Sequence, residues 1–294
     1  MKKIAAIILS AVMLSTCIVC MTGCYDPTDE FVSDGDFVYY YMGNWHKWMG
    51  NTGEDSEDCY TIVGINEEGL KEKIYVPAYY NGKEVRYTFL KKGSPWGDAG
   101  EYGVDIYGET IYFPYTHKVK DSSYFFYGAC EDCYFTNCDE EYIRRARGLL
   151  YSIYHMIRGR GLCSPLFYER FKTFLYDGAT IEEEGGYILR YQESNSWVSV
   201  LQKANTSYMF NYEGAPNEGY FFINDFERGG KIEKTPYDPQ REGYTFAGWY
   251  KEPECINVWN FEQDTLPAAE YDENGELIYT ETKLYAKWET ASDL

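Results

Sequence analysis

The segment REGYTFAGWYKEPEC at residues 241–255 mixes aromatic residues with glycines, and TKLYAKW follows it at residues 282–288. Short runs of aromatic and β-branched residues favour β-strands. Gly243 and Gly248 let the backbone turn beneath the large rings, because glycine has no side chain to clash. We therefore expect a small sheet with an aromatic core made of Phe246, Trp249, Trp259, Leu284 and Trp288.

Further motifs extend this pattern over residues 204–290. Residues 208–214 read as a first strand, and residues 229–232 as a turn and strand. In order, spacing and residue type, these segments resemble the InlB B-repeat, a small module of bacterial surface proteins. The resemblance implies a β-grasp-like sheet. Insertions at residues 215–219 and 268–276 exceed the usual length of the repeat, and both fall where a loop can grow at little thermodynamic cost.

The N-terminus has the order of a secretory signal. Two lysines precede an apolar run over residues 4–14, and small residues lead to Met21-Thr22-Gly23-Cys24. The ending resembles the lipobox of bacterial lipoproteins, which implies cleavage after residue 23 and a diacylglycerol on Cys24. We expect residues 1–23 to be removed, residues 24–35 to form a tether, and the protein to lie on the extracellular face of the bacterial membrane. The alternative is an uncleaved membrane anchor.

Residues 36–138 have the composition of short strands. Asn81-Gly82 is a strong turn signal, and the text Ile-Tyr-Val-Pro at residues 74–77 recurs as Ile-Tyr-Phe-Pro at residues 111–114. Together with Phe-Tyr-Gly-Ala-Cys at residues 126–130, these segments resemble BspA-like leucine-rich repeat proteins. The resemblance implies a short β-solenoid or an open sheet.

Residues 139–203 contain two helical patterns, and we expect them to form a helical spacer, with strand-like residues again from Tyr187. Asp139 precedes an acidic first turn and an amphipathic run. Ser164-Pro165 is a good N-cap and first-turn pair for a second helix, which carries an aromatic stripe and ends by Gly178. The whole chain is therefore predicted to be mainly β, or α+β.

Charge argues against nucleic acid as a partner. Residues 1–23 hold two lysines and no acid, so the processed chain carries 25 basic and 47 acidic side chains, a net charge of −22. A duplex-binding protein needs clustered lysine and arginine to displace counterions. The one basic stretch includes Arg144, Arg145, Arg147, Arg158 and Arg160, and we interpret it as a solvated helix face.

Cysteines offer the main candidates for covalent chemistry. Cys59, Cys130, Cys133, Cys138, Cys163 and Cys255 remain after export and lipid attachment. This even number favours disulfides in the central group, which is Cys130, Cys133 and Cys138 with Cys163 downstream. The pairing of the cysteines stays open. Buried thiols are the alternative for this group. The spacing is poor for zinc, and a pair of Cys163 with His155 lacks an orienting residue, so we expect no metal, no cofactor and no catalytic residues.

Aromatic residues near the start of the fold suggest a platform for ligands. The candidate ligand-contact residues are Tyr39, Tyr41, Trp45 and Trp48. Such rings can stack on sugars or peptides, and the alternative is that they pack as an ordinary strand. We therefore expect a non-catalytic binding or adhesion protein, held on the membrane by its lipid, with a glycan or a protein of a host or neighbouring cell as ligand. The alternatives are a hydrolase of extracellular polymers with an unrecognised carboxylate pair, and a structural spacer.

The lipid assignment can be tested at Cys24. Because the thioether forms on this sulfur, Cys24→Ala is expected to leave the precursor unprocessed in the membrane fraction. Intact mass spectrometry of that fraction measures the loss of residues 1–23 and the gain of the acyl chains. Normal processing of the variant would contradict the assignment.

Overall fold

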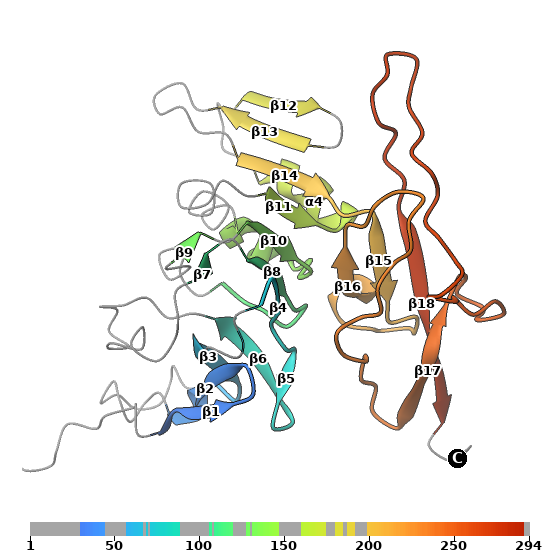
Figure 1. Cartoon of the computed structure of the whole chain (residues 1–294). Coiled ribbons are helices and arrows are strands. Elements are labelled where there is room, and N and C mark those ends of the chain that lie inside the picture. The colour runs from blue at the N-terminus through green and yellow to red at the C-terminus, as the bar shows by residue number, and fades with distance from the viewer. Residues whose placement is uncertain are drawn as a thin grey trace, which may run out of the picture.

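The computed structural model describes residues 30–44, 57–66, 69, 71–88, 106–107, 109–119, 128–129, 131–146, 160–174, 180–184, 187–191 and 199–290. As the sequence predicts, these residues form a mainly β structure with a small helical part. Its three larger sheets are built mainly from successive parts of the chain, from the blue N-terminal strands to the red C-terminal ones (Figure 1).

The N-terminal sheet has the order β1-β2-β3-β6-β5. Its strands are β1 (Val32–Asp34), β2 (Phe37–Tyr41), β3 (Tyr60–Ile65), β5 (Tyr79–Tyr80) and β6 (Lys83–Thr88), and a 3-10 turn, η2 (Met42–Asn44), follows β2. Asn81 and Gly82 join β5 to β6 with φ values of 47° and 73°. The predicted Asn-Gly turn is thus confirmed, because both residues tolerate this left-handed conformation.

The central sheet has the order β12-β13-β14-β11-β10-β8-β4. Its parallel strands are β4 (Lys73–Tyr75), β8 (Thr110–Phe113), β10 (Asp132–Phe135), β11 (Arg160–Cys163) and β14 (Ser199–Lys203). Its antiparallel edge consists of β12 (Thr180–Glu184) and β13 (Tyr187–Tyr191). A separate parallel pair joins β7 (Ile106–Tyr107) to β9 (Gly128–Ala129).

The two similar segments, residues 74–77 and residues 111–114, contribute neighbouring strands to the central sheet. Ile74 pairs with Ile111, and Tyr75 pairs with Tyr112, so the two copies lie side by side in register. Both isoleucines are buried. A parallel strand order that follows the chain order is consistent with the predicted short solenoid or open sheet.

The interval 139–203 is not only helical. Residues 140–146 are helical, and the Asp139 carboxylate accepts from the backbone N–H groups of Glu141 and Tyr142 at 3.0 Å. Helix α4 (Pro165–Thr173) begins at the predicted N-cap, where Ser164 accepts from the Phe167 N–H. The interval also supplies β11 to β14, so it continues the central sheet instead of separating two domains.

The C-terminal sheet has the order β16-β15-β18-β17. It consists of β15 (Thr206–Met209), β16 (Tyr220–Asn224), β17 (Tyr244–Tyr250) and β18 (Thr282–Thr290), and a 3-10 turn, η6 (Asn217–Gly219), precedes β16. The central strands β15 and β18 are parallel and the outer ones antiparallel, which agrees with the β-grasp-like expectation. Trp249, Trp259 and Leu284 are buried, and Phe246 and Trp288 pack partly buried against them.

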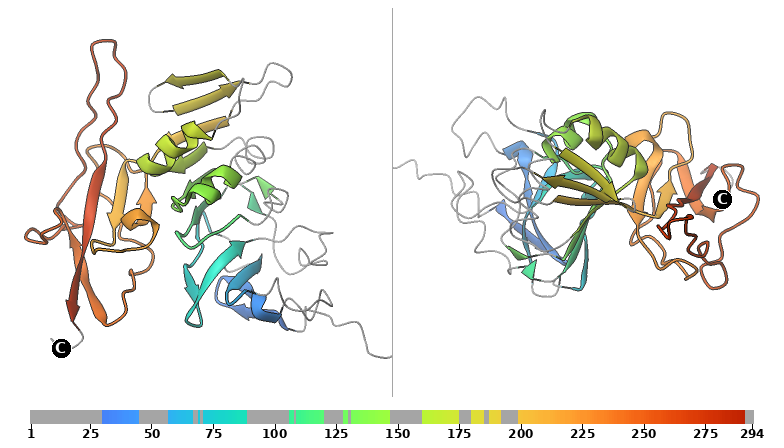
Figure 2. Two further views of the ribbon diagram at one scale, coloured as in Figure 1. Left: turned by 180° about the vertical axis from the view of Figure 1, so that it is seen from behind. Right: turned by 90° about the horizontal axis from the view of Figure 1, so that it is seen from above.

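The C-terminal sheet docks on the central sheet through a ladder of tyrosine rings. Tyr112 stacks between Tyr75 and Tyr134, with centroid distances of 4.6 and 4.2 Å. Phe222 of β16 lies 5.6 Å from the Tyr112 ring, and the Tyr112 hydroxyl donates to Asn224 at 3.0 Å. Because β16 is buried along its whole length, one hydrophobic core runs through both sheets. Figure 2 shows the two sheets side by side.

A buried histidine links the N-terminal and central sheets. The His117 ring stacks on Phe113 of β8 and lies 3.2 Å from the hydroxyl of Thr88 at the end of β6. Its Nδ1 lies 3.0 Å from the hydroxyl of Tyr142, in the helical residues 140–146. Burial lowers the pKa of His117 to about 3, so the ring is neutral at physiological pH.

The shared core predicts that the sheets unfold together. Phe222→Ala is expected to destabilise the chain by about 3–5 kcal/mol, the typical effect of removing a large ring from a core. Urea unfolding followed by tryptophan fluorescence and by far-UV circular dichroism measures this change, and the two signals should share one midpoint. Tyr271→Ala, which removes an exposed ring, is the matched control and should leave the midpoint unchanged. Separate midpoints in the parent protein would contradict a shared core.

His117 predicts a dependence of stability on pH. Its folded pKa lies below its unfolded value of 6.5, so the unfolded state binds more protons between these values and stability falls as pH decreases. Between about pH 7.5 and about pH 5, this group should account for a loss of about 2 kcal/mol. His117→Gln should show a shallower fall in urea unfolding over the same range. Equal slopes for the two proteins would contradict a neutral buried histidine.

Candidate functional site

Two adjacent hollows form a candidate ligand site, which we call the junction groove. The first has a volume of about 550 Å³ and lies between β6, the loops after β8 and β10, helix α4 and η6. The second has a volume of about 560 Å³ and reaches past β6 to the helical residues 140–146. Both hollows are lined by Lys118, Asn137 and Asp139, so these three residues form the ridge between them.

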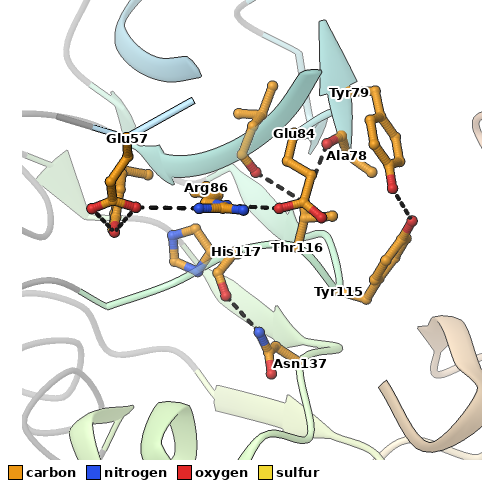
Figure 3. A network of polar contacts seen from close by, with 11 residues as sticks. Glu57, Ala78, Tyr79, Glu84, Arg86, Tyr115, Thr116, His117 and Asn137 are labelled. Carbon is orange, nitrogen blue, oxygen red and sulfur yellow. Dashed lines mark hydrogen bonds and ion pairs between the residues drawn. The ribbon is translucent and has the colours of Figure 1, made fainter. Parts of the chain in front are cut away.

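Arg86 of β6 sets the charge of one wall. Its guanidinium donates to Glu84 at 2.6 Å and to Glu57 at 3.3 Å (Figure 3). The Tyr87 hydroxyl also donates to Glu57, at 2.8 Å. Both carboxylates are thus held by donors from one strand, which fixes their positions and neutralises part of their charge.

The ridge is held by hydrogen bonds to the backbone. The Thr116 hydroxyl donates to the Val85 carbonyl at 2.9 Å, and the Lys118 N–H donates to the Arg86 carbonyl at 2.6 Å. The buried Asn137 amide donates to the His117 carbonyl at 2.7 Å (Figure 3). These bonds attach the loop after β8 to β6 and to the loop after β10. They present the exposed Lys118 side chain from a fixed backbone.

The opposite wall belongs to the C-terminal sheet. The Asn217 side chain donates to the Thr136 carbonyl at 2.8 Å and accepts from the Cys138 N–H at 2.5 Å. Asn217 has a φ of 54°, a conformation that asparagine tolerates better than most residues. Arg170 of α4 completes the wall by donating to the Cys138 carbonyl and to Glu218. The insertion predicted at residues 215–219 therefore builds one side of the groove.

The predicted ligand residues have different environments. Tyr39 is only 5% exposed and stacks on Tyr80 at 3.8 Å, so it is a core residue, as the alternative interpretation proposed. Tyr41 is partly exposed, and its hydroxyl donates to Asp58 at 2.6 Å. Trp45 and Trp48 lie outside the described residues, as does Cys24.

The structure connects Tyr41 to the groove through two consecutive residues. Asp58 accepts from Tyr41 and from Lys83, whose ammonium lies 5.5 Å from the Tyr41 ring centroid. Glu57, the preceding residue, lines the second hollow and bonds Arg86. The partly exposed end of the predicted platform thus adjoins the junction groove.

The described cysteines, Cys59, Cys133, Cys138, Cys163 and Cys255, form no disulfide. The disulfide prediction for the central group is therefore wrong for Cys133, Cys138 and Cys163. In the central sheet Cys133 pairs with Gly161, and Cys163 pairs with Phe135. The two cysteines of these neighbouring strands are therefore offset in register. Cys130 lies outside the described residues.

These thiols are poor candidates for a nucleophile. Burial raises the pKa of Cys138 to about 12, and its sulfur lies 3.1 Å from the Ser164 hydroxyl. Burial also raises the pKa of Cys163 well above its usual value, and His155 is outside the described residues. Because the thiolate is the reactive form, neither described cysteine is activated. In the described part of the chain, acidic, histidine and cysteine side chains form no cluster that could hold a metal ion.

Sequence reasoning did not predict the groove. Arg86, Asn137 and Asn217 belong to no motif, and the hydrogen bond from Asn217 to Thr136 spans 81 residues of sequence. The available signal was the insertion at residues 215–219, an addition to a repeat that was otherwise accounted for by its own core.

The described residues contain no helix long and apolar enough to cross a membrane.

Comparison with known proteins identifies the C-terminal module. Residues 208–287 match the Listeria-Bacteroides repeat domain. A Gly-rich membrane protein of Evansella cellulosilytica is 35% identical over 65 residues, which cover 22% of this chain and 6% of that protein. The chain thus spans a small fraction of the length of this relative. The match at residues 208–287 supports a surface protein with a B-repeat-like module.

Proposed function

We propose that the protein is a non-catalytic binding or adhesion protein, attached to the outer face of the bacterial membrane by a lipid on Cys24. The repeat at residues 208–287 supports surface display, and the signal-like N-terminus supports export. The in-register parallel strands β4, β8 and β10 support a short domain of the BspA-like leucine-rich repeat type.

The junction groove carries the binding proposal. Its walls come from β6, from two loops of the central sheet and from η6, so docking of the module completes the site. The lining combines cationic, anionic, amide and hydroxyl groups, which supply donors and acceptors side by side. A glycan fits this chemistry best, because each sugar hydroxyl both donates and accepts.

Two exposed side chains are well placed to contact such a ligand. Lys118 lies on the ridge between the hollows, and Glu140 lines the first hollow. Tyr41 lies at the neighbouring edge, where a sugar ring could stack on it. Individually weak contacts would be reinforced by many copies on one membrane.

The hydrolase alternative is less well supported by the groove. A glycosidase needs one carboxylic acid and one carboxylate flanking the scissile bond. Glu57 and Glu84, two carboxylates of the groove, are both engaged by the Arg86 guanidinium. The arrangement therefore favours binding over hydrolysis. A purely structural spacer would not need a groove of this kind.

The test is a glycan array and a panel of surface proteins, probed with the soluble chain from residue 25 onward. For a ligand found in this way, Lys118→Ala with Glu140→Ala should weaken binding by at least about tenfold, a typical loss for two polar contacts. Both side chains are exposed, so the melting temperature should not change. Lys231→Ala with Glu242→Ala is the matched control, because it removes the same charges from exposed positions outside the groove.

Two further variants separate the groove from the aromatic platform. Trp45→Ala or Trp48→Ala should weaken binding without loss of thermal stability if the platform extends the site. Wild-type affinity in the Lys118 and Glu140 variant would contradict the groove. Hydrolysis of a polymer that is abolished by changing one acidic residue to its amide would contradict the non-catalytic role.

A further inference from the structure

A second surface feature is the hairpin of residues 267–281, which precedes β18. Tyr271 bridges to Leu277, and the Ile278 N–H donates to the Glu270 carbonyl at 2.8 Å. At the tip, the Asp272 carboxylate accepts from the N–H groups of Asn274 and Glu276. Figure 1 shows this hairpin in red, projecting beyond the three sheets.

The base of the hairpin is anchored to the module. The Tyr279 hydroxyl donates to the Ala204 carbonyl at 2.7 Å, and the Thr282 N–H donates to the Asn205 carbonyl at 2.8 Å. The hairpin corresponds to the insertion predicted at residues 268–276. It is therefore an ordered addition to the repeat that the core of the module does not need.

The hairpin is strongly acidic. Its acidic residues are Glu270, Asp272, Glu273, Glu276 and Glu281, and it contains no lysine or arginine. Among the described residues, only Glu281 of this set forms an ion pair, with Lys283 at 3.6 Å. Backbone hydrogen bonds to the Asp272 carboxylate lower its pKa, and the bond from the Glu276 N–H has the largest effect. The tip consequently carries a concentrated negative charge at neutral pH.

The same hairpin exposes apolar side chains. Tyr271 is 62% exposed and Ile278 is 43% exposed. Their contact with water is unfavourable in proportion to the apolar area, and a two-stranded hairpin cannot bury them by itself. Exposed apolar groups rimmed by charge are typical of interaction surfaces.

We infer that the 267–281 hairpin is an interaction surface for a cationic amphipathic polypeptide, one that presents lysine or arginine beside apolar side chains. Charge complementarity selects this partner, because the acidic side chains lack cationic neighbours on the hairpin. An anionic membrane surface would be repelled. A chelated metal ion is not indicated, since the described acidic side chains form no metal-binding cluster. The inference is independent of the junction groove.

The test uses the soluble chain from residue 25 onward and a fluorescently labelled peptide in which lysine and leucine alternate. Glu270→Gln with Glu273→Gln and Glu276→Gln should weaken binding by at least about tenfold at low salt. The control is Glu213→Gln with Glu242→Gln and Glu254→Gln, which removes the same net charge from exposed positions of the module. The control should bind as the parent does, within about twofold.

Further comparisons test the apolar contribution. Tyr271→Ser with Ile278→Ser should weaken binding of the lysine–leucine peptide but not of a lysine–serine peptide. A peptide with glutamate in place of lysine should not bind. Equal losses in the hairpin and control triple variants would overturn the inference, since binding would then follow the overall charge of the chain. No loss in the hairpin triple variant, or none in the serine double variant, would overturn it as well.

Discussion

The arrangement of the protein depends on the packing of β16 against the tyrosine ladder of the central sheet. Phe222 covers the Tyr112 ring, and Asn224 accepts from its hydroxyl, so an apolar contact and a directional bond coincide. Stacked rings supply large buried areas, while the hydrogen bond gives the Tyr112 hydroxyl an acceptor on β16. The B-repeat-like module consequently shares its core with the rest of the described chain and is not packed as a separate domain.

This docking also creates the groove. With β16 fixed on the central sheet, η6 is held beside the loop after β10, and Asn217 can bond both Thr136 and Cys138. Arg170 then joins the module to α4 through Glu218. A residue from an inserted loop has thus become part of a wall shared by two sheets. The same physical contact that stabilises the fold places the polar groups of the candidate site.

Local features were predictable from the sequence, and long-range ones were not. The caps at Asp139 and Ser164 and the aromatic core around Trp249 follow from signals within a few residues. The repeated Ile-Tyr text also identified a pair of neighbouring strands. By contrast, β11 is too short to show a clear alternation of apolar and polar residues, so it was not predicted within the helical spacer. Tyr39 was assigned to a surface because its type suits stacking, whereas its burial depends on a partner, Tyr80, from another strand.

The position of the acidic hairpin has a mechanical consequence. In Figure 1 and in the views of Figure 2, the hairpin lies at the end of the molecule away from β1, the first described strand after the N-terminal segment. Because the sheets between these ends share one core, tension applied at the hairpin would be borne by packed side chains and not by a slack linker. A pull on this tip would therefore strain the Tyr112–Phe222 contact and, with it, the wall of the groove.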